Sequence, residues 1–96
     1  MKVFVVYILK CSDGTYYTGM TSNLEQRLVS HEQGRYKDGY TDARRPVQLV
    51  FHCEFTEAHH AISTEKQLKK WSKAKKEALI KGEFDILPKL AKKVFR

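Results

Sequence analysis

The hydrophobic pattern at the start of the chain predicts a β-hairpin. Residues 3–9 are nearly all apolar and rich in β-branched and aromatic side chains. Such a run is typical of a strand that is covered on both faces and lies centrally in its sheet. The Ser12-Asp13-Gly14 sequence that follows is a strong turn signal, and residues 15–19 continue as the partner strand.

The length of this turn decides which side chains of the hairpin meet. We expect a three-residue loop with Gly14 in the left-handed region, so that Leu9 faces Tyr17. In the same register Tyr7 faces Gly19, and the two tyrosines project from one side of the sheet. Gly19 has no side chain, and we expect it to leave open space over Tyr7. A two-residue loop would place the tyrosines on opposite faces.

Helix signals and strand alternation predict the remaining elements. Ser22 and Glu25 fit a capping box that starts a helix near Asn23, and Gly34 is a natural stop. Later segments predict a half-buried strand over 47–55, a helix over 57–71, a lysine-rich helix near 73–81 and a C-terminal helix from Pro88. We therefore expect an α+β fold with a three-stranded antiparallel sheet, made of the hairpin and the third strand, flanked by helices.

Several polar side chains occupy positions that the pattern predicts to face the core. On the first helix, Arg27 and His31 share one face with two leucines, so half of that face is cationic or titratable. On the helix over 57–71, the apolar stripe includes Ile62 and Leu68, and Glu65 lies in its middle, three residues from each. A buried ionised group is costly unless something compensates it. We therefore expect these groups and the two hairpin tyrosines to share one site.

The composition fits one domain, spanning residues 1–96, whose excess positive charge lies at one end. The chain is 42% apolar and 30% charged, and no apolar run approaches the roughly 20 residues of a membrane span. The N-terminal apolar run is short and lacks a small-residue cleavage pattern, so we expect a cytoplasmic protein without a signal peptide. Residues 1–68 hold eight basic and eight acidic side chains, whereas residues 69–96 hold ten basic and three acidic ones.

This one-sided basic segment is the usual electrostatic footprint of phosphate-backbone binding, and a solvated lysine-rich face is the alternative. The loop over 34–46 also interleaves basic and aromatic side chains, a composition expected for gripping or stacking on nucleic acid. The candidate nucleic-acid-binding residues are Arg35, Lys37, Tyr40, Arg44, Arg45, Lys69, Lys70 and Lys73.

The cysteines favour no metal centre. Cys11 and Cys53 form no disulfide framework, and we interpret them as reduced strand residues. A zinc site in which they join His52, His59 and His60 is the alternative, but no CxxC or HxxxH spacing occurs.

In their order and spacing, the polar candidates resemble the GIY-YIG nuclease superfamily. Val5-Val6-Tyr7 precedes Tyr17-Thr18-Gly19 by ten residues, as in the two strand motifs that name the family. The order then continues as in the family through Thr21, Arg27, His31 and Glu65. Gly34, Thr41 and Arg45-Pro46 are similar to the small single-domain bacterial branch, which is related to the catalytic modules of structure-specific endonucleases. The similarity covers residues 3 to about 80.

The chain departs from the family pattern at three points. Val5 stands where the first motif has glycine, and Thr18 stands where the second has isoleucine. Many members carry an asparagine after the glutamate, whereas this chain has none beyond Asn23. The missing asparagine places more weight on His31.

The resemblance implies a GIY-YIG-like fold and a metal-dependent DNA endonuclease that acts on branched, flapped or damaged structures in repair or recombination. The implied catalytic residues are Tyr7, Tyr17, Arg27, His31 and Glu65. Glu65 would hold Mg²⁺ or Mn²⁺, because hard cations take oxygen ligands and polarise phosphate oxygens. A structural ion pair with Arg27 is the alternative role for this carboxylate.

The other implied roles concern charge and proton transfer. Arg27 would stabilise the charge that develops on the phosphorus centre, because its planar fork stays protonated. Tyr7 would act as the base or orient water, with His31 accepting the proton of Tyr7 or acting directly. Tyr17 would position the phosphate.

Two further functions remain open from the sequence. One is a nucleic-acid-binding module of the same fold that cuts weakly or only with a protein partner. The other is an interaction protein whose basic tail docks on an acidic partner.

Overall fold

The sheet has the predicted antiparallel arrangement, with the apolar N-terminal strand at its centre. The computed structural model describes residues 2–35 and 39–83. Its strands lie in the order β2-β1-β3. The elements are β1 (Phe4–Lys10), β2 (Tyr16–Thr21), α1 (Leu24–Glu32), a 3₁₀ helix (Asp42–Arg44), β3 (Gln48–Phe55), α2 (Ala58–Lys70) and α3 (Lys73–Lys81). The predicted helix from Pro88 and the candidate Lys37 lie outside the described residues.

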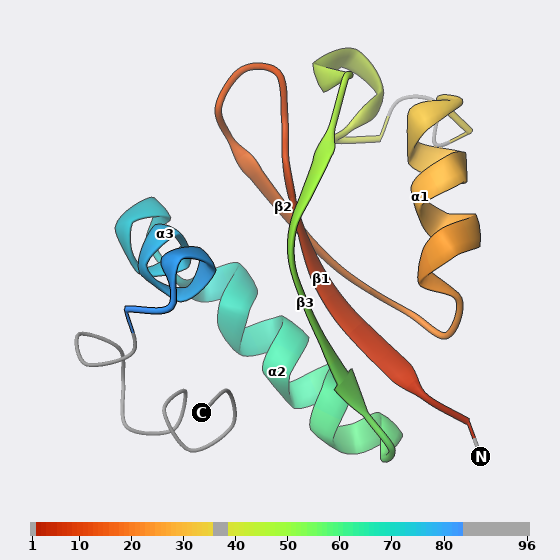
Figure 1. Cartoon of the computed structure of the whole chain (residues 1–96), viewed down its shortest axis with the longest axis vertical. Helices are drawn as coiled ribbons and strands as arrows, with labels where there is room; N and C mark the ends of the chain where they lie inside the picture. The colour runs from red at the N-terminus through yellow and green to blue at the C-terminus, as the bar shows by residue number, and fades with distance from the viewer. Residues whose placement is uncertain (1, 36–38, 84–96) are drawn as a thin grey trace.

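The helices cover the two faces of the sheet unequally. Helix α1 lies on one face, whereas α2 and α3 lie together on the other (Figure 1). Since alternate residues of a strand point to opposite faces, β1 divides its side chains between these layers. Val6 and Ile8 pack with Leu68 of α2 and Leu79 of α3 in an aliphatic core. Tyr7 points to the face that α1 covers and is fully buried there.

The hairpin confirms the three-residue turn. Gly14 has a φ of 84°, and the Cys11 N–H donates to the Thr15 carbonyl at 2.8 Å. The register pairs Leu9 with Tyr17 and Tyr7 with Gly19. Both tyrosines therefore lie on the same face, as the odd-length loop predicted.

The first helix begins at the predicted place, but Ser22 does not cap it. Asn23 is the N-cap, and its side-chain oxygen accepts the Gln26 N–H at 3.0 Å. The Thr21 hydroxyl accepts the Asn23 N–H, which orients the capping residue. An asparagine side chain caps as well as a serine, so the start of the helix is unchanged. Gly34 follows the helix with a φ of 69°, as its role as a stop requires.

The third strand and the second helix follow their predicted patterns with two differences. The pairing of β3 with β1 shifts between Ile8 and Leu9, so Val50 is an extra residue in β3. On α2, Ile62 is 40% exposed, although the stripe predicted it to face the core. The buried face of α2 contains Ala61 and Leu68. Ile62 follows Ala61 directly, so its side chain is rotated by about 100° around the helix axis, away from this face.

No helix within residues 2–35 and 39–83 combines the length and the apolar character needed to span a membrane.

Candidate active site

A buried hydrogen-bonded chain links the central strand to the loop that follows α1. The Tyr7 hydroxyl lies 3.0 Å from Nε2 of His31. Nδ1 of the same ring lies 2.9 Å from the hydroxyl of Thr41. The three residues are 0%, 2% and 2% exposed, respectively. Because both ring nitrogens have partners, the imidazole is held in one orientation inside the protein.

The chain can carry a proton away from Tyr7. When Nδ1–H donates to Thr41, the other ring nitrogen is free to accept the Tyr7 proton. Burial and, to a lesser extent, the nearby charge of Arg27 lower the pKa of His31 below its usual value of 6.5. The imidazole is therefore neutral at pH 7, which is the form that accepts a proton.

Tyr17 stands beside this pair and is less deeply buried. Its ring centroid lies 5.3 Å from that of His31 and 6.3 Å from that of Tyr7. On its other side the ring of Tyr40 lies 6.2 Å away. Tyr17 thus connects the buried histidine to the partly exposed loop around Tyr40. The predicted convergence of Tyr7, Tyr17 and His31 is present in the structure.

The expected open space over Gly19 is absent, because Tyr7 itself occupies it. A Cβ atom built on Gly19 would lie 2.5 Å from both Cζ and the hydroxyl oxygen of Tyr7. The sequence suggested that the glycine admits something from outside. Instead, the ring of Tyr7, the cross-strand neighbour of Gly19, packs directly against the glycine. The prediction of a vacant space was wrong. Glycine is required at position 19 because any side chain there would collide with the Tyr7 ring.

Arg27 lies on α1 within electrostatic range of His31. Its side chain lines an open, polar hollow of about 290 Å³ at the start of the helix, together with Thr21, Ser22, Asn23, Gln26 and Ser30. Arg27 is therefore half-buried beside an open hollow, and its charge still acts on His31. That combination suits a group that must meet a phosphate from outside.

Glu65 lies on α2 and so approaches the site from the opposite layer. Its side chain is 20% exposed, and its ion pair within the described chain is with Lys69, at 3.4 Å, rather than with Arg27. Lys69 lines a second hollow together with Tyr17 and Thr18. The pair places the carboxylate beside Lys69, on the helix that covers the face opposite α1, and its convergence with Tyr7 and His31 stays a prediction (Figure 1).

Glu65 fits a hard divalent cation in the chemistry of its donor atoms. It is a half-buried carboxylate whose partner, Lys69, is 53% exposed. An exposed lysine is easily displaced, because such pairs are weak in water. Mg²⁺ commonly takes one or two protein carboxylates and completes its shell with waters and substrate oxygens. Glu65 is thus the residue that would hold the ion, which when bound polarises phosphate oxygens.

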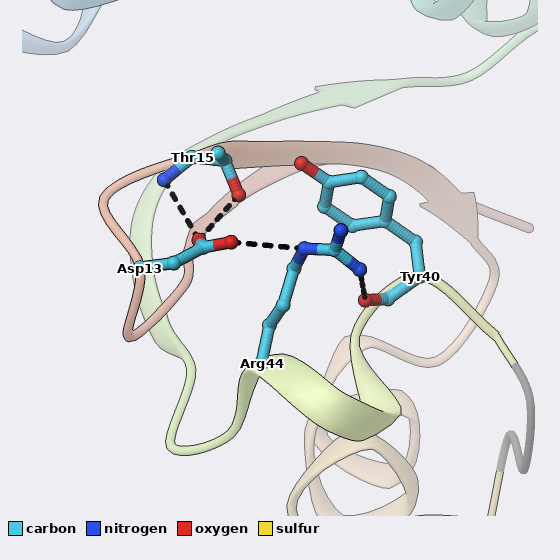
Figure 2. A network of polar contacts seen from close by, with 4 residues as sticks. All are labelled: Asp13, Thr15, Tyr40 and Arg44. Carbon is cyan, nitrogen blue, oxygen red and sulfur yellow. Dashed lines mark hydrogen bonds and ion pairs between the residues drawn. The ribbon is translucent and has the colours of Figure 1, made fainter.

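The basic residues of the loop make contacts within the protein. Arg44 donates from Nε to Asp13 at 2.9 Å and from Nη1 to the Tyr40 carbonyl at 2.8 Å (Figure 2). Its guanidinium also lies 4.1 Å from the centroid of the Tyr40 ring. Hydrogen bonds from Thr15, and then from Arg44, hold the pKa of Asp13 below its usual range. This clamp fixes Tyr40 against the hairpin.

Arg45 ties the same loop to the end of α1. Its Nη1 donates to the Glu32 carbonyl at 3.1 Å, and its Nε donates to the Asp42 carbonyl at 3.1 Å. A Cβ atom on Gly34 would lie 2.8 Å from the Arg45 guanidinium carbon. Arg45 therefore organises the loop, in addition to the nucleic-acid contact predicted for it. Arg35, Lys69, Lys70 and Lys73 are exposed, as a phosphate-binding role requires.

The metal-ligand side chains that gather in the described chain are a different set from the one named for zinc. The one group of three metal-ligand side chains in the described chain is Glu57, His59 and His60, and all three are exposed. A Glu57 carboxylate oxygen lies 3.1 Å from Nε2 of His59 and 3.7 Å from Nδ1 of His60. Both cysteines are free thiols outside it.

Sequence reasoning gave Thr41 no role in the site. Thr41 was noted only for its resemblance to one family branch, and its contact with His31 depends on the loop path. Lys76 belongs to the Lys69–Lys76 cluster that the sequence predicts to contact phosphates, and it lines two hollows beside β2. The sequence carries no local signal that separates Lys76 from the neighbouring lysines of this cluster.

The sheet, its helices and the buried tyrosine–histidine cluster define a catalytic domain of a known class. The GIY-YIG catalytic domain family matches the chain over residues 3–78. The UPF0213 protein of Syntrophus aciditrophicus is 51% identical over 77 residues, which cover 79% of this chain and 87% of the relative. The UPF0213 protein of Natronomonas pharaonis is 42% identical over 78 residues, which cover 81% and 91%, respectively.

A solved structure agrees with this assignment. The solution NMR structure of the UPF0213 protein of Bacillus halodurans matches with a TM-score of 0.55 and 37% identity, covering 82% of this chain and 83% of that chain. The chain therefore belongs to the GIY-YIG family. A domain of this family indicates a nuclease that binds nucleic acid, and such nucleases generally use divalent metals.

Proposed function

We propose that this protein is a divalent-metal-dependent endonuclease that hydrolyses phosphodiester bonds in DNA. Its substrates would be branched, flapped or damaged structures that arise in repair or recombination. The observation that carries the proposal is the 3.0 Å contact between the Tyr7 hydroxyl and Nε2 of His31, with Tyr17 and the Arg27 charge beside it. Packing alone does not require a buried hydroxyl–imidazole contact of this kind, so the contact supports a catalytic role.

Tyr7 and His31 would act as a proton-transfer pair. An unperturbed tyrosine, with a pKa near 10, is a poor base at neutral pH. A neutral imidazole in hydrogen-bonding contact takes the proton and so makes the tyrosine oxygen a better base or water-orienting group. Tyr7 is fully buried in this state, so neighbouring side chains must move for water to reach its hydroxyl.

Tyr17 and Arg27 would meet the phosphate. Tyr17 is the more accessible of the two tyrosines and lines the hollow beside β2. Its hydroxyl can donate to a non-bridging oxygen, whereas the guanidinium of Arg27 stabilises the charge that develops there. Glu65 on α2 would hold Mg²⁺ or Mn²⁺, which would polarise the phosphate oxygens.

The lysines of α2 and α3 would contact phosphates, which carry no sequence information. A structure-specific substrate therefore suits the protein better than a defined sequence.

A cleavage panel tests the proposal. Nicked, flapped, branched and linear DNA are incubated with the purified protein and either Mg²⁺ or Mn²⁺. Cleavage should require the metal, and Arg27→Ala should slow it by about 10²–10³-fold through loss of one charge-stabilising donor. Arg27→Lys keeps the charge without the fork and should recover part of the rate. If every DNA substrate stays intact at all salt concentrations and pH values tested, the proposed nuclease activity is rejected.

The metal ligand is tested separately. Glu65→Ala should abolish metal-dependent cleavage and weaken Mn²⁺ binding, whereas Glu83→Ala removes an exposed carboxylate and should do neither. A second function, a binding module with weak cleavage, is favoured by the full burial of Tyr7 and by the Glu65–Lys69 pair. If Glu65→Ala leaves both cleavage and Mn²⁺ binding unchanged, the binding module is the better description.

A further inference from the structure

Two adjoining hollows lie along the edge of β2, outside the Tyr7–His31 cluster. The first, of about 140 Å³, is lined by Thr15, Tyr16, Tyr40, Lys73 and Lys76. The second, of about 260 Å³, is lined by Tyr16, Tyr17, Thr18, Tyr40, Lys69 and Lys76. They share two tyrosines and Lys76, and we call them together the β2-edge hollow. It runs from the hairpin turn to Tyr17.

The charges around the β2-edge hollow do not cancel. Lys69 pairs with Glu65, and Glu77 accepts a hydrogen bond from the Tyr16 hydroxyl at 3.2 Å. Across residues 2–35 and 39–83, neither Lys73 nor Lys76 has an ion-pair partner. Lys76 is half-buried, and its burial lowers the pKa of its ammonium group. A partly desolvated cation without an anion is costly, so the hollow is complementary to a negative group.

A buried hydroxyl in the same place also lacks a partner. Thr18 lines the second hollow and is 3% exposed. Its Oγ1 is the one buried side-chain oxygen or nitrogen in the described chain that has no hydrogen bond. Buried polar groups are normally satisfied, so the unpartnered hydroxyl and the half-buried Lys76 of the same hollow both favour a ligand with acceptor oxygens. A phosphate meets both demands, and Lys73 lines the adjoining hollow.

The aromatic rings add a surface for bases. Tyr40 is 43% exposed, and the Asp13–Arg44 clamp holds it in place (Figure 2). A base can stack on such a ring only if its own face is free, which excludes a base inside a paired duplex. Rings interleaved with lysines along a groove are typical of single-strand binding.

We propose that the β2-edge hollow binds an unpaired DNA strand, the single-stranded arm of a flapped or branched substrate. Lys73 and Lys76 hold its phosphates, Tyr40 stacks on a base, and Tyr17 marks the end at which the strand enters the catalytic cluster. The inference rests on the proposed nuclease function for the identity of its ligand. It adds which arm of the substrate is recognised and where.

Binding in EDTA tests the hollow without cleavage. Fluorescence anisotropy measures the affinity for a labelled oligothymidylate and for a blunt duplex of the same length. Lys73→Ala/Lys76→Ala should weaken single-strand binding at least tenfold and lower the salt slope by about 1.4, since each phosphate contact contributes about 0.7 for single strands. Tyr40→Ala should cost about tenfold, and Tyr40→Phe should restore binding because the ring is kept.

The matched control removes the same charge from the same helix. Lys75 and Lys81 are exposed residues of α3 that do not line the hollow. Lys75→Ala/Lys81→Ala should reduce single-strand affinity much less than the hollow pair. If both double variants lose the same single-strand affinity, the loss comes from the lower net charge alone, and the inference is overturned. Duplex affinity that falls as far as single-strand affinity would overturn it too.

The outcome separates this inference from the nuclease proposal. If no substrate is cut but the hollow variants lose single-strand affinity selectively, the hollow is a single-strand site in a protein that does not cleave. If cleavage depends on Arg27 and Glu65 while the hollow variants bind single strands like the unmodified protein, the nuclease stands and the hollow assignment fails.

Discussion

The two faces of the sheet hold different chemistry, although their residues alternate along the same strands. The face toward α2 and α3 buries aliphatic side chains such as Val6, Ile8 and Leu68. The face toward α1 buries Tyr7, His31 and Thr41 in a hydrogen-bonded chain. The aliphatic face is stabilised by area removed from water, and the polar face depends on the geometry of each bond.

This difference predicts unequal tolerance to change. An aliphatic layer accepts hydrophobic substitutions that keep its volume, because its interactions have no direction. A buried polar chain loses its orientation when one member is removed, and the remaining groups are left unsatisfied. We therefore expect the free energy of unfolding to depend on side-chain volume at the aliphatic face and on hydrogen-bonding groups at the polar face.

The largest effect is expected on the aliphatic face. Ile8 is fully buried, and Ile8→Ala should lower the free energy of unfolding by about 2–5 kcal/mol through lost burial and a residual cavity. Urea unfolding followed by circular dichroism measures the change. Ile8→Val is the matched control and should cost about 0.5–1.5 kcal/mol. Equal losses for the two variants would show that packing at Ile8 does not dominate this layer.

The junction between Gly19 and Tyr7 should give the next largest effect. Gly19→Ala places a methyl group 2.5 Å from the Tyr7 ring, and overpacking of this kind costs about 1–3 kcal/mol. Tyr7→Leu removes the ring atoms that the methyl group meets. A double-mutant cycle should therefore show that Gly19→Ala costs much less in the Tyr7→Leu background. An additive cycle would contradict the steric account.

Thr41 tests the polar face directly. Thr41→Val keeps the shape but leaves Nδ1 of His31 without its partner, which should cost about 1–2 kcal/mol. Thr41→Ser retains the hydroxyl and should recover most of the stability. NMR titration of the imidazole gives a readout that a purely structural loss would not move, because the pKa of His31 should change in Thr41→Val and not in Thr41→Ser.

The smallest effect is a pH dependence that also comes from the polar face. His31 has a lowered pKa in the folded state, so the unfolded chain binds its proton more readily. Stability should therefore be fully present above pH 6.5, the usual pKa, and should fall as the pH drops below it. His31→Gln should flatten the decline. The cleavage rate should likewise persist below pH 6.5, because the lowered pKa keeps His31 neutral there. A cleavage rate that already falls with acid above pH 6.5 would contradict a neutral buried imidazole.

Much of the fold could be predicted because its signals are local. The turn residues around Gly14 determined the hairpin register, and the register placed Tyr7 and Tyr17 on one face. The stop at Gly34 and the stripe through Leu68 were likewise readable from spacing. The cap at Asn23 in place of Ser22 was missed because either side chain can accept the same N–H group.

The candidate site was predictable only where its residues share an element or a register. The sequence alone determined which elements form within the described residues, the register of the hairpin and which family motifs the side chains match. The tertiary structure decided that His31 reaches both Tyr7 and Thr41, that Tyr7 fills the space over Gly19, and that Glu65 pairs with Lys69. The physical reason is that periodicity reports on one element at a time, whereas these contacts depend on how separate elements and loops are packed against each other.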